Sequence, residues 1–269
     1  MEILLHGNVF EVASLIFVFF YGQYLLLAGV AYVVFWHWGK LRFAHRRIQS
    51  NPRPAKPWRE LGHSTIAIAC FSATLVIGMY AGRAGWFNIY TDIAQYGWAW
   101  FVFTVVLMGV VHDSYYYWAH RFMHHPALFR HVHKVHHSFP NPTPFACNAF
   151  HPFDAAIEVM WVPLFLLVIP THPYAVATYV VVFTTLNVMA HLGYEFASPR
   201  IARWFITSTH HNMHHSGSKG HFMLYFNWWD RWQGSNESHY EARIREIHKR
   251  TPFRNEADAG VAVGTVGAK

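Results

Sequence analysis

The chain has 269 residues, of which 53% are hydrophobic, 18% aromatic and only 13% charged, about half the charged fraction of an average soluble domain. Its 21 Lys and Arg outnumber its 14 Asp and Glu, which gives a formal net charge of +7. This composition argues against an ordinary soluble domain and indicates a membrane protein. No known nucleic-acid-binding motif accompanies the basic excess, so we expect no nucleic-acid partner. The two cysteines, Cys70 and Cys147, are too few for a disulfide framework or a thiolate metal site.

Five apolar stretches are candidates for membrane helices. In chain order they cover residues 12–36, 61–82, 97–111, 155–169 and 174–192. The first two contain no Lys, Arg, Asp or Glu and have the roughly 20 residues that a spanning helix needs. The last two flank the Pro-Thr-His-Pro turn at 170–173, which predicts a helical hairpin. No small-residue cleavage site follows the first stretch, so we expect a retained span rather than a signal peptide.

The distribution of basic residues orients these stretches. Residues 40–59 contain seven Lys and Arg and no acidic residue, which indicates the cytoplasmic side by the positive-inside tendency. With five crossings, residues 112–154 and 193–269 return to that side, and among the basic residues only Arg83 falls on the other. We therefore predict a multi-pass protein with both of these long segments facing the cytoplasm, where their Lys and Arg can meet anionic lipid.

Most of the histidines gather in the same two regions. Fifteen of the 22 lie there, nine between residues 112 and 151 and six between 191 and 221. Three sets have helical spacing, and we expect each set to project from one face of a helix. The sets are His120 with His124, then His133, His136 and His137, then His211, His214 and His215. Two sets with the same HxxHH spacing are difficult to obtain by chance.

Imidazoles clustered in this way predict a metal site. Imidazole suits Zn, Cu, Fe and Ni, so the ligand type leaves the metal open. Eight histidines exceed the four ligands of a structural zinc site and the three of a catalytic one, which favours two metal ions. Nearby carboxylates are few, unlike those of the Glu-rich soluble di-iron bundles. A histidine-rich metal transporter and a zinc-binding membrane protein remain alternatives, although a transporter should place its ligands near mid-membrane.

These observations combine into a prediction of the fold. We expect an all-α integral membrane protein with four to five membrane helices and a cytosolic helical cap that carries a histidine-rich dimetal site. Residues 1–111 would form N-terminal membrane helices. Residues 112–250 would form the histidine-rich catalytic region, with the helical membrane hairpin 155–192 inside it. Residues 251–269 would form a flexible tail.

Five segments together resemble one known superfamily in their order and spacing. They are HDSYYYWAHRFMHH at 112–125, HKVHH at 133–137, TPFACNAFHPFD at 143–154, HHNMHH at 210–215 and WDRWQGS at 229–235. This pattern is similar to that of the sterol desaturase and fatty acid hydroxylase superfamily of membrane di-iron enzymes. The HKVHH, TPFA and AFHP runs look most like the sterol C5-desaturases, or lathosterol oxidases.

The resemblance implies the cofactors, the partners and the location. It implies two iron ions, molecular oxygen as a cosubstrate and electrons from an external donor, such as cytochrome b5 or ferredoxin with its reductase. It also implies a lipid substrate drawn from the bilayer. The site would lie on the cytoplasmic face of a bacterial inner membrane or of the endoplasmic reticulum.

The same resemblance assigns roles to particular residues. The metal ligands it implies are His120, His124, His133, His136, His137, His191, His211, His214 and His215. Asn187 stands where fatty acid hydroxylases of the superfamily have the first histidine of an HxxxH pair, so one metal has a more open shell or another nitrogen replaces it. The candidates for an additional ligand are His112, His151, His210 and Asn187. We expect Asp113, Asp154 and Glu195 to accept hydrogen bonds from ligand imidazoles.

The reaction expected from such a site is oxidation of an unactivated C–H bond, by desaturation or by hydroxylation. The similarity to C5-desaturases and the departure at Asn187 favour a sterol or related isoprenoid over an acyl chain. A fatty acid or lipid hydroxylase of the same superfamily remains the alternative.

Overall fold

The computed structural model describes residues 1–50, 52–217 and 219–252. Within these ranges the backbone is helical with connecting turns and forms no strand, only three isolated bridges. The predicted all-α fold is confirmed. Most of the flexible tail predicted for 251–269 lies outside the described residues.

The elements of the bundle and of its connections are α1 Glu2–His6, α2 Val9–Ala31, η1 Tyr32–Trp38, η2 Ala44–Arg46, α3 Pro57–Arg83, η3 Ile93–Gln95, α4 Gly97–Met123, α6 Pro152–Val159, α7 Trp161–Val168 and α8 Pro173–Ala190. The remaining elements have ten residues or fewer and are α5 Pro126–Phe129, η4 His136–Ser138, η5 Pro144–Asn148, α9 Pro199–Ala202, α10 Ser208–Gly217, α11 Trp228–Trp232 and α12 Tyr240–Lys249.

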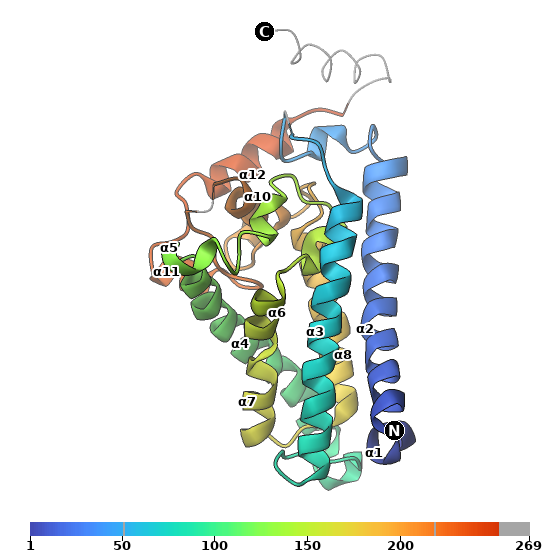
Figure 1. Cartoon of the computed structure of the whole chain (residues 1–269). Coiled ribbons are helices and arrows are strands. Elements are labelled where there is room, and N and C mark those ends of the chain that lie inside the picture. The colour runs from blue at the N-terminus through green and yellow to red at the C-terminus, as the bar shows by residue number, and fades with distance from the viewer. Residues whose placement is uncertain (51, 218, 253–269) are drawn as a thin grey trace.

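Four helices are long and apolar enough to cross a membrane. They are α2 continued by η1, α3, α4 and α8. In the bundle α2 packs against α3 and α8, and α4 packs against α8. Figure 1 shows the short helices α5, α10, α11 and α12 gathered as a cap at one end of this bundle, with α1 at the other end. The chain is therefore a membrane protein with a helical cap, as predicted.

The stretch 155–169, expected to form one membrane helix, is divided into α6 and α7. Each has eight residues, and a turn at Met160 separates them. The break has a local cause, because Pro163 has no amide hydrogen and its ring clashes with the carbonyl four residues earlier, at Val159. α6 packs against α3 and α7 against α4, so the hairpin with α8 has one broken arm and one continuous arm (Figure 1).

The helix α4 is longer than the stretch 97–111 predicted as a span. It continues without interruption to Met123 and crosses the expected domain boundary at residue 111. One rigid helix therefore carries both a membrane segment and the first histidine set into the cap. The domain division remains a prediction.

Backbone hydrogen bonds between loops show which loops lie at each end of the bundle. Near the cap, the amide of Ile48 donates to the carbonyl of Gly193 (3.1 Å) and the amide of Glu195 to that of Arg46 (2.9 Å). At the other end, the amide of Thr171 donates to the carbonyl of Asn88 (2.8 Å). The basic loop 40–59 thus lies at the histidine-rich end, and the loop that follows Arg83 lies at the opposite end.

Candidate metal centre

The predicted histidine sets meet where the bundle joins the cap. His120 lies in the last turns of α4 and His124 caps it, His191 caps α8, and α10 carries His211, His214 and His215. The run 133–137, however, is not an α-helix. His133 lies in a turn, and His136 and His137 begin the single 3-10 turn η4. The 3-10 turn ends before Phe139, which precedes Pro140, and the α conformation is disfavoured for a residue before proline.

Nine buried or half-buried histidines form two groups with converging ligand atoms. Within each group, one nitrogen from every ring lies within 4.8 Å of the others. Cluster 1 contains His120, His124, His133, His137 and His214, and cluster 2 contains His136, His191, His211 and His215. These are the nine residues named from the sequence. Each HxxHH run contributes to both clusters, because its three rings diverge.

The two clusters are adjacent. The rings of His137 in cluster 1 and His215 in cluster 2 have centroids 5.2 Å apart, and those of His136 and His133 are 5.3 Å apart. The arrangement therefore offers two neighbouring sites that belong to one continuous group of imidazoles.

Backbone carbonyls fix the orientation of three of these rings. The Nδ1 of His120 donates to the carbonyl of Phe222 (2.9 Å), that of His214 to Gly220 (2.6 Å) and that of His191 to Asn187 (2.8 Å). A neutral imidazole has one N–H, so the Nε2 of each ring carries a lone pair. All three lone pairs point into the clusters, which is the arrangement that second-sphere carbonyls impose on metal-binding histidines.

The ring nitrogens that point into the clusters lie close to one another, which is unusual for buried polar atoms. The Nε2 of His124 is 3.2 Å from the Nε2 of both His137 and His214, and the Nε2 of His211 is 3.0 Å from that of His191. Among the described residues, neither nitrogen of the fully buried His136 has a hydrogen-bond partner. Buried polar atoms are normally paired, so converging lone pairs and an unpaired imidazole fit a cation at each cluster.

Burial keeps these imidazoles neutral at neutral pH. Burial is the main cause that lowers the pKa of His191 and His214 to about 4. Burial and the neighbouring histidines lower the pKa of His133, His136 and His211 well below the usual 6.5. The neutral imidazole is the form that binds a metal ion, so the environment prepares the ligands.

One of the three expected carboxylates contacts a cluster imidazole. Asp154 Oδ2 lies 2.8 Å from the Nδ1 of His133, and both side chains are fully buried. Burial raises the pKa of Asp154. A metal ion bound to the other ring nitrogen of His133 would lower the pKa of Asp154 again and keep the carboxylate ionised. The same arrangement of carboxylate, histidine and metal is common in metal sites.

The other two carboxylates hold backbone segments rather than imidazoles. Asp113 accepts from the amides of Leu224, Tyr225 and Phe226, with donor–acceptor distances of 3.3, 2.8 and 3.3 Å. Glu195 accepts from the Thr207 hydroxyl and from the Thr209 amide at the start of α10. A carboxylate can satisfy several buried amides at once, and these amides have no strand or helix partner.

Asp230, which the sequence analysis did not single out, completes this support. It accepts from the amides of Phe222 (2.9 Å) and Met223 (3.0 Å). With Asp113, it therefore satisfies five consecutive amides from 222 to 226. The carbonyls of Gly220 and Phe222 in and beside this segment orient His214 and His120. The WDRWQGS motif contained the signal, an aspartate between two tryptophans.

The four candidates for an additional ligand lie outside both clusters. His112 Nδ1 faces the hydroxyls of Tyr179 and Tyr225, and its ring stacks on Trp161. His151 caps α6 by accepting from the amide of Phe153. The side chain of Asn187 donates to the carbonyl of Cys147 (2.7 Å), while its backbone carbonyl orients His191.

The fourth candidate, His210, belongs to a different group. Its ligand atom lies within 4.8 Å of those of His221 and Asp230, and all three side chains are buried. His221 was not among the residues selected from the sequence, because it has no partner at helical spacing.

Apolar space lies on the membrane side of the clusters. A groove of about 650 Å³ runs along α4 and α8 and is lined by residues including Val106, Leu186, Phe205 and Tyr225. A smaller cavity of about 60 Å³ shares Tyr179 and Phe183 with this groove and is also lined by His112, Asn187 and Phe150. The ring of Phe150 lies 4.8 Å from that of His136. Apolar surface therefore leads from the bundle toward cluster 2.

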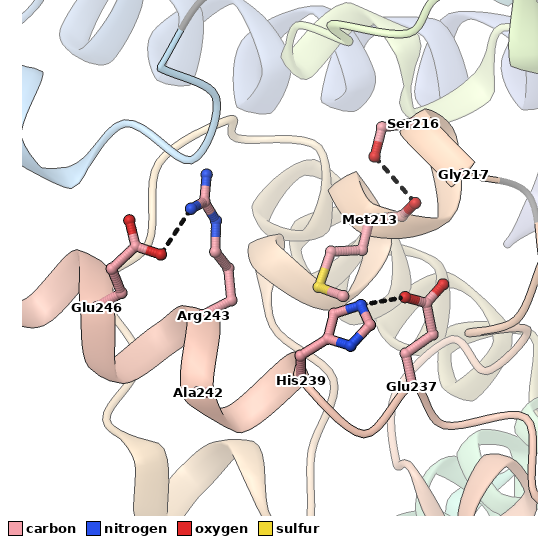
Figure 2. A pocket seen from close by; sticks show the side chains of 8 residues that line it. All are labelled: Met213, Ser216, Gly217, Glu237, His239, Ala242, Arg243 and Glu246. Carbon is pink, nitrogen blue, oxygen red and sulfur yellow. Dashed lines mark hydrogen bonds and ion pairs between the residues drawn. The ribbon is translucent and has the colours of Figure 1, made fainter.

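A polar pocket lies on the outer side of α10 (Figure 2). It has a volume of about 470 Å³, and Met213, Ser216 and Gly217 of α10 line it opposite α12. Its charged groups pair among themselves, Arg243 with Glu246 at 2.7 Å and His239 with Glu237 at 3.0 Å. No unpaired group in it points to a ligand.

Comparisons with known proteins agree with this geometry. Residues 105–235 match the model of the fatty acid hydroxylase family. The chain is 30% identical over 196 residues to a Delta(7)-sterol 5(6)-desaturase of Gibberella zeae, covering 72% of this chain and 60% of that protein. It is 35% identical over 154 residues to the lathosterol oxidase of Rattus norvegicus, covering 56% of this chain and 51% of that protein.

A third relative is the lathosterol oxidase of Homo sapiens, 28% identical over 190 residues that cover 69% of this chain and 63% of the human protein. The chain thus spans less than two thirds of the length of these three relatives. No solved structure matches it. The histidine motifs, the paired imidazole clusters and these similarities agree, and the chain belongs to the sterol desaturase and fatty acid hydroxylase superfamily.

Proposed function

We propose that the chain is a membrane di-iron oxidoreductase that uses molecular oxygen to desaturate a sterol or a related isoprenoid lipid. The observation that carries this proposal is the convergence of the Nε2 lone pairs of His120, His191 and His214 on two adjacent clusters. The family match and the sterol-oxidising names of the relatives support the choice of chemistry.

The nine histidines of the clusters are the proposed iron ligands, five for one ion and four for the other. When bound, the two irons supply the oxygen-activating and C–H-oxidising chemistry. Desaturation removes two hydrogens from neighbouring carbons, and two electrons from a donor with two protons from water complete the reduction of one oxygen molecule to two water molecules. We propose an external donor, cytochrome b5 or ferredoxin with its reductase, which docks on the cap.

The protein's own residues position the substrate and exclude water from the site. The apolar groove beside α4 and α8 can receive a lipid directly from the bilayer. Tyr179 and Phe183 line both the groove and the smaller cavity, so they would guide the substrate toward His136. The carbonyls of Gly220 and Phe222 hold two ligand rings and thereby keep the donor set in place before metal binding.

The location of the clusters separates this proposal from transport. The histidines lie at the cap end of the bundle, beside the basic loop 40–59, which we propose to be cytoplasmic. A transporter would be expected to carry such ligands near the membrane centre. We propose that the membrane is a bacterial inner membrane or that of the endoplasmic reticulum.

Hydroxylation of an acyl chain is the second candidate, because the matching family model is that of the fatty acid hydroxylases. Both outcomes begin with removal of one hydrogen, and substrate placement selects between loss of a second hydrogen and gain of oxygen.

One expression experiment tests both candidates. The chain would be produced together with an electron donor in a host that lacks its own C5-desaturase. The host would be supplied with a sterol in which the bond between C5 and C6 is saturated. We expect a sterol product lacking two hydrogens, and no product from a His136→Ala variant. Acyl chains that gain one oxygen while sterols are unchanged would establish the hydroxylase instead. Unchanged sterols and acyl chains, with metal present and the donor active, would contradict both candidates.

A further inference from the structure

A third group of metal-binding side chains lies beside cluster 1, and the proposed reaction does not use its imidazoles. It consists of His210 from α10, His221 from the following loop and Asp230 from α11. The rings of His210 and His221 have centroids 4.2 Å apart with an angle of 76° between their planes. His210, His221 and Asp230 are all fully buried.

Both imidazoles lack the hydrogen bonds that buried histidines normally make. Among the described residues, neither nitrogen of His210 and neither nitrogen of His221 has a hydrogen-bond partner. The Nε2 of His210 has a close polar contact, because it lies 3.1 Å from Asp230 Oδ2. The other three nitrogens of the two rings have no polar partner among the described residues, which is far from the usual pattern, in which buried polar atoms are satisfied.

The backbone at His221 provides an independent observation. Its φ angle is +63°, and no other non-glycine residue in the described ranges has a positive φ. An L-residue in this region is strained, and the strain persists only where the surroundings impose the conformation. Its amide donates to the carbonyl of Ser235 (2.9 Å), which holds the strained turn against the chain after α11. The conformation aims the ring at His210 and Asp230.

The chemistry of the three donors matches a divalent transition metal. Asp230 already accepts from the amides of Phe222 and Met223 and from the hydroxyl of Ser235 (2.7 Å). Three donors to one carboxylate favour its ionised form. Two neutral imidazoles and one carboxylate leave a fourth position for water, which is a common ligand set for zinc and suits iron as well.

We propose that His210, His221 and Asp230 bind a third divalent metal ion of the zinc class, separate from the two clusters. The ion joins α10, the loop before α11 and α11 itself. Asp230 also accepts hydrogen bonds from the segment that begins at residue 222, and carbonyls in and beside that segment orient His120 and His214. The third ion would therefore help to keep these two ligands of cluster 1 in position. Its binding does not depend on which metals or reaction the clusters support.

The test compares metal content in three purified full-length proteins supplied with zinc. We expect about three ions per chain in the wild type and about two in His221→Gly, since glycine tolerates the positive φ. His239→Ala is the matched control, because His239 is exposed and paired with Glu237 in the outer pocket, and it should retain three. His221→Asn is the second variant, because asparagine also tolerates a positive φ and can fold where the glycine variant does not.

A crystal or cryo-EM sample of the wild type locates the ion. We expect an anomalous zinc peak, or matching density, in bonding distance of His210, His221 and Asp230. Two ions per chain with no density at this position would overturn the proposal, as would three ions in both variants at position 221. Density at the third site with none at the clusters would overturn the dimetal proposal alone.

Discussion

The Nε2 atom of His214 lies 3.2 Å from the Nε2 atom of His124, although 90 positions separate these residues in the chain. The Nδ1 of His214 donates to the carbonyl of Gly220, so its Nε2 lone pair is directed at the neighbouring ring. This contact defines cluster 1, because it joins the end of α4 to α10 through two imidazoles.

Removing one histidine from each cluster should reduce the bound metal. His214→Ala in cluster 1 and His136→Ala in cluster 2 should each lower the bound metal by up to about one ion per chain and lower turnover at least about 100-fold, since each variant removes one donor and its orientation from the cluster. Elemental analysis of the purified protein measures the loss. His125→Ala is the control, because His125 is exposed and caps α5, and it should retain both ions. Wild-type metal content in the two cluster variants would refute the ligand assignment.

Asp154 should strengthen metal binding through His133. Asp154→Ala removes the acceptor of the His133 Nδ1 and should weaken metal binding at cluster 1 by about 10- to 100-fold, the range for such orienting carboxylates. A chelator competition series gives the affinity. Asp92→Ala, an exposed helix cap at the opposite end of the bundle, should leave it unchanged. Equal affinities in the two variants would show that Asp154 only fills space.

Acid should destabilise the metal-free protein. In the folded chain the pKa of His191 and of His214 is about 4, whereas in the unfolded chain each takes up a proton near pH 6.5. Between these values the unfolded state binds more protons, so stability is fully present above about pH 6.5 and falls as the pH decreases. The slope is about 1.4 kcal/mol per pH unit for each histidine. Unfolding of chelated protein in detergent at pH 7.5, 6.5 and 5.5 measures it, and stability that is constant or rises on acidification would falsify this account.

The two ends of the bundle should lie on opposite sides of the membrane. In a background without Cys70 and Cys147, single cysteines replacing the exposed residues Arg42 and Ser238 should react with an impermeant thiol reagent from the same side. One replacing Gln95, in the loop after α3, should react from the other side. Labelling of the Arg42 and Ser238 positions from different sides would contradict the proposed topology.

The sequence by itself determined the helical membrane class and the identity of the clustered histidines. Hydropathy over some 20 residues reflects the cost of exposing apolar side chains to water, which depends on local sequence alone. The helices α2, α3, α4 and α8 could therefore be located without tertiary information. Spacing and residue type likewise identified eight of the nine histidines that form the clusters, and the resemblance to the superfamily added His191. The break between α6 and α7 was also local in origin, because Pro163 is visible in the sequence, but its effect on the span was not anticipated.

The tertiary structure decided how these residues are combined. The HxxHH run at 133–137 was expected to present one helical face, whereas a turn before Pro140 sends His133 and His137 to cluster 1 and His136 to cluster 2. Asp113 and Asp230 accept from backbone amides 222–226, and His221 joins His210 only because its backbone adopts a positive φ. Contacts such as that between His120 and Phe222, 102 positions apart, depend on the packing of distant segments, for which local spacing carries no signal.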